Sequence, residues 1–247
     1  ELGLDWVYVA CEVAAGSVAA AFAGARALGL GGLSVTIPHK AAALAEVDEA
    51  TPPARAVGAV NTVVLRDDGR LLGENTDGSG FLASLADEGF HPAGRRCAVV
   101  GAGGAARAVV HALAGADALE VVVVNRSPER AEMTAALAGA TGRVGVAADL
   151  EGVDLVVNAT PLGLAGSDPD VLPLDPDLLG KGQLVVDLVP NPAVTPLMRA
   201  ARARGARVAG GLGMLVHQGA LAFEMWTGHP APLGVMRSAA VQALHAG

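Results

Sequence analysis

Short apolar runs alternate with longer stretches of helical periodicity along most of this chain. In the first third, the pattern predicts strands at residues 7–10 and 33–37 on either side of a helix over 14–28, which ends at Gly29 as helices often do. This order indicates a βαβ unit. Pro38 stands where a first helical residue is favoured, so a second helix is expected from there to residue 47, with Lys40 in its first turn.

Residues 60–66 and 70–73 have the composition of strands and flank Asp67-Asp68-Gly69, a strong turn signal, so they predict a hairpin. A helix over 78–85 follows, and from residue 97 strands alternate with helices, which indicates a parallel, doubly wound sheet. We expect its strands at 97–100, 121–124, 154–157, 184–188 and 207–209, and its helices at 105–113, 128–137 and 195–204. Helices at 215–226 and 233–244 finish the chain and are expected to pack back on the first domain.

Composition narrows the class of protein. Hydrophobic residues make up 52% of the 247 residues and charged residues 17%, which fits an α/β enzyme of two domains. The net charge of -8 argues against nucleic acid or an anionic membrane as partner and favours a small molecule. The uncharged stretch 208–223 falls short of a membrane span. Cys11 and Cys97 lie far apart and indicate neither a disulfide framework nor a zinc site, so a reducing, cytoplasmic setting is expected.

A glycine-rich segment follows the strand at 97–100 and precedes a helix: Gly101-Ala102-Gly103-Gly104-Ala105-Ala106. This context predicts a dinucleotide-binding loop, because Gly101 permits a tight turn, Gly103 lets backbone amides approach a pyrophosphate, and Ala106 allows close packing of the helix on the strand. The helix N-terminus favours the anion. A turn that serves packing alone is the alternative, and the flanking strand and helix disfavour it.

The next strand ends in Asn125-Arg126-Ser127-Pro128-Glu129-Arg130, without the acidic residue that an NAD enzyme places at the strand end. Arg126 can stack on adenine and pair with a 2′-phosphate, Ser127 can donate to that phosphate, and Arg130 lies one turn further on. These residues predict NADP. An ordinary helix capped by Ser127, with two solvated arginines, is compatible with the same segment.

Of the 17 basic residues only Lys40 and Lys181 are lysines. A lysine can lose and regain a proton where a guanidinium cannot, and a helix N-terminus destabilises a neighbouring ammonium, so Lys40 suits a general acid and base. Asp77 lies at the expected junction between domains and is a suitable partner, because a Lys/Asp pair can move a proton and hold a substrate hydroxyl without metal. A solvated surface lysine and a common Asp-Gly turn are the alternatives. The six histidines show no metal-ligand spacing, so no metal site is expected.

Seven segments in this order resemble the shikimate dehydrogenase family and together cover nearly the whole chain. They are Val35-Thr-Ile-Pro-His-Lys40, Val57-Gly-Ala-Val-Asn61-Thr62, Asn75-Thr-Asp-Gly78, the loop at Gly101, Asn125-Arg126-Ser127, Asn158-Ala-Thr-Pro161 and Gly211-Leu-Gly-Met-Leu-Val-His-Gln218. The resemblance implies an N-terminal α/β substrate domain, residues 1–77 and 212–247, and a Rossmann-type, doubly wound NADP domain, residues 78–211. It also implies NADP-dependent, reversible reduction of 3-dehydroshikimate to shikimate, a step of aromatic amino-acid biosynthesis.

The matching positions imply roles for single residues. Lys40 would be the catalytic acid and base and Asp77 its partner, while Thr36, Asn61 and Gln218 would hold substrate hydroxyls. The positions implied for NADP are Gly101, Ala102, Gly103, Gly104, Ala105, Asn125, Arg126, Ser127 and Arg130, with Leu188 and Gly211 at the nicotinamide end.

Some positions depart from the family. Pro190 stands where the family usually has a tyrosine that contacts substrate, and proline has no hydroxyl to donate. Ser34 and Glu74 replace a frequent Asn and a frequent Asp. The family's Ser-x-Ser motif, which binds the substrate carboxylate, is expected upstream of Glu1. Quinate or another cyclic hydroxy acid is therefore an alternative substrate, and a non-catalytic NADP-binding protein is an alternative function. The acidic charge disfavours a tRNA-linked reductase, and both a monomer and a homodimer are compatible with the sequence.

Overall fold

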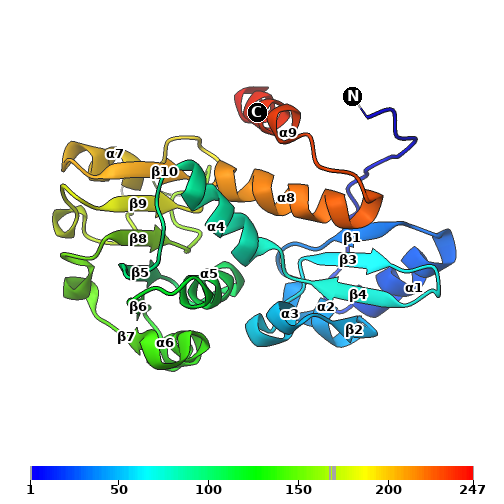
Figure 1. Ribbon diagram of the computed structural model, residues 1–247, viewed down its shortest axis with the longest axis horizontal. Helices are drawn as coiled ribbons and strands as arrows, with labels where there is room; N and C mark the ends of the chain where they lie inside the picture. The colour runs from blue at the N-terminus through cyan, green and yellow to red at the C-terminus, as the bar shows by residue number, and fades with distance from the viewer. Residues whose placement is uncertain (1, 167, 169–170, 247) are drawn as a thin grey trace.

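The computed structural model describes residues 2–166, 168 and 171–246, and it forms two lobes joined by helices (Figure 1). The first lobe has a four-stranded sheet of order β1-β3-β4-β2, in which β3 is antiparallel to both neighbours and β2 is parallel to β4. Its elements are α1 (Val18–Leu28), β1 (Gly32–Ser34), α2 (Lys40–Glu46), β2 (Glu49–Ala50), α3 (Pro52–Val57), β3 (Thr62–Leu65) and β4 (Leu71–Glu74). The expected hairpin is present as β3 and β4, and α1 ends at Gly29 as predicted.

The prediction of a strand at residues 7–10 is wrong. No described strand pairs with this segment, and Val7, Tyr8 and Val9 are 83%, 75% and 66% exposed. A strand needs a neighbour that takes up its N–H and C=O groups, and within the described part of the chain β1 pairs with β3 alone. The expected βαβ unit is therefore replaced by an antiparallel pairing.

Pro38 does not begin a helix. It lies in a turn in which the His39 N–H donates to the Thr36 carbonyl at 2.9 Å, and α2 begins only at Lys40. Two short elements were not expected, β2 and α3. The signal for α3 was local, because the Thr51 hydroxyl accepts from the Ala54 N–H and prolines occupy the first helical positions.

The second lobe confirms the predicted doubly wound architecture. Its six strands are all parallel and have the order β10-β9-β8-β5-β6-β7. The elements are β5 (Arg96–Val100), α5 (Gly104–Gly115), β6 (Glu120–Val124), α6 (Pro128–Ala135), β7 (Gly142–Val144), β8 (Leu155–Asn158), β9 (Leu184–Asp187), α7 (Pro196–Ala203) and β10 (Arg207–Gly210), with short 3-10 helices at Ala136–Thr141, Ala147–Leu150 and Pro176–Leu178. The three-residue strand β7 was not predicted.

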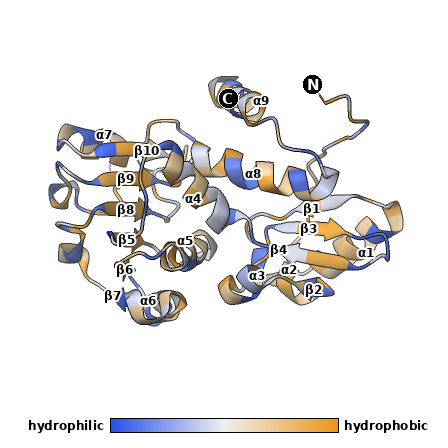
Figure 2. Cartoon of the chain, viewed as in Figure 1, coloured by the Kyte–Doolittle hydropathy of each residue, from blue (hydrophilic) through white to orange (hydrophobic). Residues whose placement is uncertain are grey.

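Buried apolar side chains cover both faces of this sheet. Val157 of β8 packs with Leu113 of α5 on one face, and Val156, its neighbour, packs with Leu197 of α7 on the other. This alternation explains why the strands are continuous apolar runs, as Figure 2 shows along β8 and β9.

Two helices, α4 (Asp77–Asp87) and α8 (Leu212–Thr227), pack along each other between the lobes (Figure 1). The far end of α8 reaches the first sheet, where Trp226 Nε1 donates to the Val63 carbonyl at 2.9 Å. The last helix, α9 (Leu233–Ala246), folds back on α8. Of the two C-terminal helices that were expected to pack on the first lobe, α8 makes this contact, through Trp226. Among the described residues, no helix combines the length and the apolarity that a membrane span requires.

Candidate active site

Lys40 and Asp77 meet at the N-termini of two helices from different parts of the chain. Lys40 is the first residue of α2, and Asp77 is the first residue of α4. The Lys40 Nζ lies 2.6 Å from Asp77 Oδ2, and the two side chains are 23% and 5% exposed. The ammonium therefore remains accessible to a ligand, whereas the carboxylate is enclosed.

Asn61 connects this pair to α8. Its Nδ2 donates to Asp77 Oδ1 at 2.8 Å and lies 3.3 Å from Gln218 Oε1. Thr76 closes the cluster, because its N–H donates to Asn61 Oδ1 at 2.9 Å and its hydroxyl donates to the Gln218 carbonyl at 3.1 Å. Asn61 and Thr76 are both buried. Sequence analysis gave Thr76 no role; its position directly before a helix was the available signal.

Thr36 is not joined to this cluster. It is exposed on the loop between β1 and α2, and its hydroxyl makes no hydrogen bond within the described residues. Next to Lys40, the His39 Nε2 lies 2.8 Å from the Val13 carbonyl. The Thr36 hydroxyl is thus left available to a ligand, while His39 has a structural contact.

The glycine-rich loop has the backbone that a pyrophosphate needs. Gly101 has a φ of 116° and an added Cβ would lie 3.0 Å from the Ala159 carbonyl, so a larger residue would be strained there. Helix α5 begins at Gly104, its N-cap Gly103 has no side chain to bond the first N–H groups, and added Cβ atoms at both positions would meet open space. Ala102 and Ala105 are half-buried beside them. The open amides of this helix start can receive an anion.

The segment after β6 carries unpaired positive charge. Asn125 Nδ2 donates to the Ser127 carbonyl at 3.1 Å, and the Ser127 hydroxyl accepts from the Arg130 N–H at 3.4 Å, which caps α6. The side chains of Arg126 and Arg130 are exposed, and in the described part of the chain neither forms an ion pair. The expected cap of α6 by Ser127 is therefore present, and the guanidinium groups of Arg126 and Arg130 beside it remain available to a phosphate.

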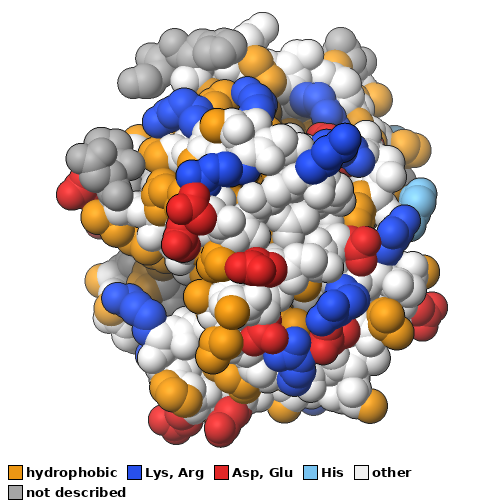
Figure 3. Space-filling view, turned by 90° about the vertical axis from the view of Figure 1, so that its left-hand side faces the viewer, with side chains coloured by type: hydrophobic (Ala, Val, Ile, Leu, Met, Phe, Trp, Pro, Cys, Tyr) orange, Lys and Arg blue, Asp and Glu red, His pale blue; other side chains and the backbone are white. Residues whose placement is uncertain are grey.

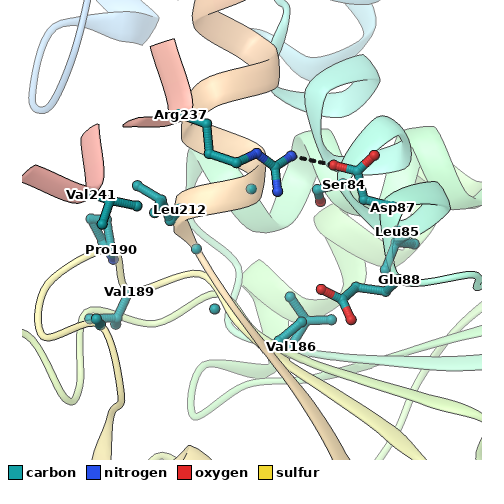
Figure 4. A pocket seen from close by; sticks show the side chains of 15 residues that line it. Ser84, Leu85, Asp87, Glu88, Val186, Val189, Pro190, Leu212, Arg237 and Val241 are labelled. Atoms are coloured by element: carbon teal, nitrogen blue, oxygen red, sulfur yellow. Dashed lines mark hydrogen bonds and ion pairs between the residues drawn. The ribbon is translucent and has the colours of Figure 1, made fainter. Parts of the chain in front are cut away.

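Leu188 and Gly211 lie together at the carboxyl ends of β9 and β10. Gly211 is buried, and an added Cβ would collide with the Leu188 carbonyl, so only glycine permits this close approach. Pro190, on the same loop as Leu188, lines a cavity of about 290 Å³ that also touches Gly211. Figure 4 shows Pro190 and Asp87 on opposite sides of this cavity.

Asp87 ties three helices together beside this cavity. The His217 Nε2 of α8 lies 2.8 Å from Asp87 Oδ2, and Arg237 of α9 pairs with the same oxygen (Figure 4). The hydrogen bonds from His217 and Arg237 hold the pKa of the Asp87 carboxyl below its ordinary value. His217, the neighbour of Gln218, therefore stabilises the packing of α8.

Comparisons with known proteins agree with this arrangement. Three family models match successive parts of the chain: the shikimate dehydrogenase substrate binding domain over residues 1–63, shikimate/quinate 5-dehydrogenase over 84–161, and the shikimate 5′-dehydrogenase C-terminal domain over 211–241. The shikimate dehydrogenase (NADP(+)) of Moorella thermoacetica is 49% identical, in a match that covers 95% of this chain and 82% of that protein. The chain belongs to the shikimate dehydrogenase family.

Solved structures of relatives share the fold. The shikimate 5-dehydrogenase of Thermus thermophilus, crystallised with NADP(H) and shikimate, is 40% identical with a TM-score of 0.87, and the match covers 94% of this chain and 86% of that one. The 5-ketofructose reductase of Gluconobacter sp. strain CHM43 is 38% identical with a TM-score of 0.83, over 94% of this chain and 86% of that one. These matches confirm the expected family and the expected fold. The two relatives have similar identities to this chain but are named for reactions on different substrates.

Proposed function

We propose that this chain catalyses the NADP-dependent, reversible reduction of 3-dehydroshikimate to shikimate, with Lys40 and Asp77 as the proton-transfer pair. The observation that carries the proposal is the 2.6 Å contact between Lys40 Nζ and Asp77 Oδ2, in which only the lysine is accessible. Asn61 and Gln218, two polar side chains expected to hold substrate hydroxyls, are in contact at the same place. The names of the curated relatives agree with this substrate and with an NADP-dependent oxidoreductase.

The pair can move one proton for each turnover. In the reducing direction the Lys40 ammonium donates a proton to the substrate carbonyl oxygen, which becomes the hydroxyl of the product. In the oxidising direction the neutral amine takes that proton back. Asp77 holds Lys40 by one carboxylate oxygen, while Asn61 occupies the other, so the amine is fixed with its free face toward the substrate.

The chain fits NADP as the second substrate. The amides at Gly103 to Ala105 would hold the pyrophosphate, Arg126, Ser127 and Arg130 the 2′-phosphate, and Asn125 the adenosine side, with Leu188 and Gly211 at the nicotinamide end. NADPH supplies the hydride when bound. The two unpaired guanidinium groups after β6 favour a phosphorylated ribose over the free hydroxyls of NAD.

We further propose a substrate domain of residues 1–77 and 212–247 and an NADP domain of residues 78–211. The first boundary follows Asp77, the first residue of α4, so the rest of this helix belongs to the NADP domain, and the second boundary falls at the start of α8. The free cysteines Cys11 and Cys97 fit a cytoplasmic enzyme. Figure 3 shows basic and acidic side chains interspersed on the outer face of the second lobe, in keeping with a small-molecule substrate. We propose a monomer or a homodimer.

Pro190 favours a second candidate within the same chemistry. A tyrosine hydroxyl that usually contacts substrate in this family is missing, because proline has no hydroxyl to donate. The alternative is reduction of a related cyclic or linear keto polyol, or oxidation of quinate. A relative that is 38% identical to this chain is named a 5-ketofructose reductase, which agrees with a keto polyol as substrate.

The deciding experiment measures NADPH formation by absorbance, with NADP and with NAD, for shikimate and for quinate as separate substrates. The proposal predicts that shikimate with NADP gives the highest kcat/KM. Faster turnover of quinate would establish the alternative substrate. Tight NADPH binding by calorimetry without turnover of any polyol would instead indicate a binding protein and overturn the assignment of Lys40.

A further inference from the structure

Asp187 is a fully buried carboxylate that the proposed proton transfer does not use. It is the last residue of β9 and is 0% exposed. Its Oδ1 accepts from Asn158 Nδ2 at 2.8 Å and from the Val189 N–H at 3.2 Å, and its Oδ2 accepts from the Thr195 hydroxyl at 2.6 Å. No cation pairs with it among the described residues.

These bonds connect the loops that follow two neighbouring strands. Asn158 ends β8, and its Oδ1 accepts from both the N–H and the hydroxyl of Thr160. Thr160 and Ala159 lie against Gly101, where an added Cβ would be 3.0 Å from the Ala159 carbonyl. Asp187 is therefore linked through Asn158 to the loop expected to receive the pyrophosphate.

The same carboxylate also fixes the loop after β9. It holds the Val189 N–H directly, and the Leu188 N–H donates to the Asn158 carbonyl at 3.0 Å. Leu188 in turn lies against Gly211. Thr195, at the end of this loop, caps α7 by accepting from the Met198 N–H at 3.2 Å. One side chain thus connects the proposed pyrophosphate loop with the proposed nicotinamide end of the cofactor site.

The hydrogen-bond pattern fits an anion. Asn158 Nδ2 and the Val189 N–H can only donate, and the Thr195 hydroxyl, whose oxygen already accepts from Met198, has its proton free for Asp187. Burial raises the pKa of the Asp187 carboxyl from its ordinary value, and these three bonds oppose the rise. A buried charge without a cation partner costs free energy, so the presence of this carboxylate beside the proposed cofactor site indicates a function for its charge.

We propose that Asp187 positions the nicotinamide end of the cofactor and that its negative charge favours the oxidised, cationic ring over the neutral reduced ring. The inference rests on the proposed NADP site. Nicotinamide bears a positive charge only in its oxidised form, so a fixed carboxylate in a poorly solvated setting stabilises NADP+ more than NADPH. Asp187 acts on the nicotinamide through its electrostatic field and through the loops that it holds, so it is a positioning residue.

The test compares the binding of three ligands to the purified protein by calorimetry, without turnover: NADP+, NADPH and adenosine 2′,5′-bisphosphate, which lacks the nicotinamide. In Asp187→Asn the ratio of the Kd for NADP+ to the Kd for NADPH is expected to rise by a factor of about five or more, the order of effect of one buried charge. The Kd for the bisphosphate should not change. An unchanged ratio, or equal weakening of all three ligands, overturns the proposed charge effect.

Asp154→Asn is the matched control. Asp154 precedes β8 at the opposite edge of the same sheet, where its carboxylate accepts from the Arg96 N–H at 2.9 Å and from Arg95 Nη1 at 3.1 Å. Its replacement removes the same charge from the same lobe and should leave the ratio at the wild-type value. A rise equal to that of Asp187→Asn would show a general effect of net charge and contradict the proposal.

Thr195→Val tests the positioning role and also covers the case in which Asp187→Asn fails to fold. This change keeps the Asp187 carboxyl group and removes the shortest hydrogen bond to it. NADP+ and NADPH should both bind several-fold more weakly, with a smaller change in their ratio than in Asp187→Asn, while the bisphosphate binds normally. Unchanged binding of all three ligands, or a ratio that rises as far as in Asp187→Asn without weaker binding of NADPH, overturns the positioning role. Because each readout is binding, absence of shikimate turnover would contradict only the proposed substrate, whereas absence of NADP+ and NADPH binding by the wild type would contradict the proposed cofactor site.

Discussion

Asn61 Nδ2 donates to Asp77 Oδ1 at 2.8 Å, on the carboxylate oxygen that Lys40 does not contact. Both oxygens of Asp77 are therefore bound by nitrogen donors, one neutral and one charged. The neutral donor is itself fixed, because the Thr76 N–H donates to the amide oxygen of Asn61. The orientation of the Asn61 amide is thus determined by the backbone that precedes α4, and it presents a donor to the catalytic carboxylate.

Asn61→Asp is expected to impair catalysis by replacing this donor with an acceptor. Two carboxylates would then face each other and bind a proton more readily than one alone. We expect kcat to fall by about tenfold to a hundredfold and the acid limb of the kcat/KM profile to move to higher pH. Steady-state kinetics across pH measure both effects. A raised KM with unchanged kcat and an unmoved pH profile would mean that Asn61 acts only on substrate binding.

Lys40→Met should remove the proton carrier and retain an apolar stem of similar length. We expect kcat to fall by about a hundredfold to ten-thousandfold, the usual contribution of a general acid or base, with little change in NADPH affinity. Lys181→Met is the control, because Lys181 is exposed in the turn before β9, at the end of that strand opposite to Leu188. Near-normal turnover by Lys40→Met would remove Lys40 from the mechanism.

Arg126→Ala should affect the choice of cofactor more than the chemistry. A charge-assisted bond to the 2′-phosphate contributes about 1.5–3 kcal/mol, so the Kd for NADPH should rise by about tenfold to a hundredfold. The Kd for NADH, which has no 2′-phosphate, should stay nearly constant and serves as the internal control. Equal losses for both cofactors would show that Arg126 acts on adenine or on the fold of the loop.

The architecture of the second lobe was readable because its signals are local. The glycine spacing at Gly101, the cap at Ser127 and the apolar strands each need only neighbouring residues to be recognised. The strand expected at 7–10 failed for the opposite reason, because a strand depends on a partner that local pattern cannot name. Likewise β7 and β2 have three and two residues and owe their existence to the sheet beside them.

The candidate site could be named from the sequence only as separate residues. Lys40 and Asp77 were identified by residue type and by the expected helix positions, and the structure brings them into contact across 37 residues of sequence. The contacts that orient them could not be foreseen, since Thr76 bonds to a residue 142 positions away and Asp187 to one 29 positions away. Such networks follow from the tertiary fold.

Arg143→Met should destabilise the protein in a pH-dependent way. Arg143 donates to Glu120 at 2.7 Å and to Asp149 at 2.8 Å, and it holds the pKa of both carboxyls below their ordinary values. A lowered carboxyl pKa stabilises the fold above the unfolded value, about 4, and this contribution is lost as pH falls through the folded value. The groups are partly exposed, so we expect a loss of about 1 kcal/mol near pH 7.

Urea unfolding of both proteins near pH 7 and near pH 3 measures this difference. The gap between wild type and Arg143→Met should narrow at the lower pH, where both carboxyls become protonated. Arg202→Met is the control, because Arg202 is exposed on α7 and has no ion pair in the part of the chain that the structure describes. A gap that stays constant with pH would show that Arg143 contributes through packing of its stem.

Gly211→Ala should disturb the contact between the β9 loop and α8. An added Cβ would collide with the Leu188 carbonyl, and because this is backbone, the loop itself must move. We expect a loss of roughly 1–3 kcal/mol in unfolding free energy and weaker binding of NADPH, with adenosine 2′,5′-bisphosphate little affected. Gly234→Ala is the matched control, since an added Cβ there meets open space at the start of α9 and should be neutral or slightly stabilising. Normal NADPH affinity in Gly211→Ala would place the nicotinamide away from Leu188.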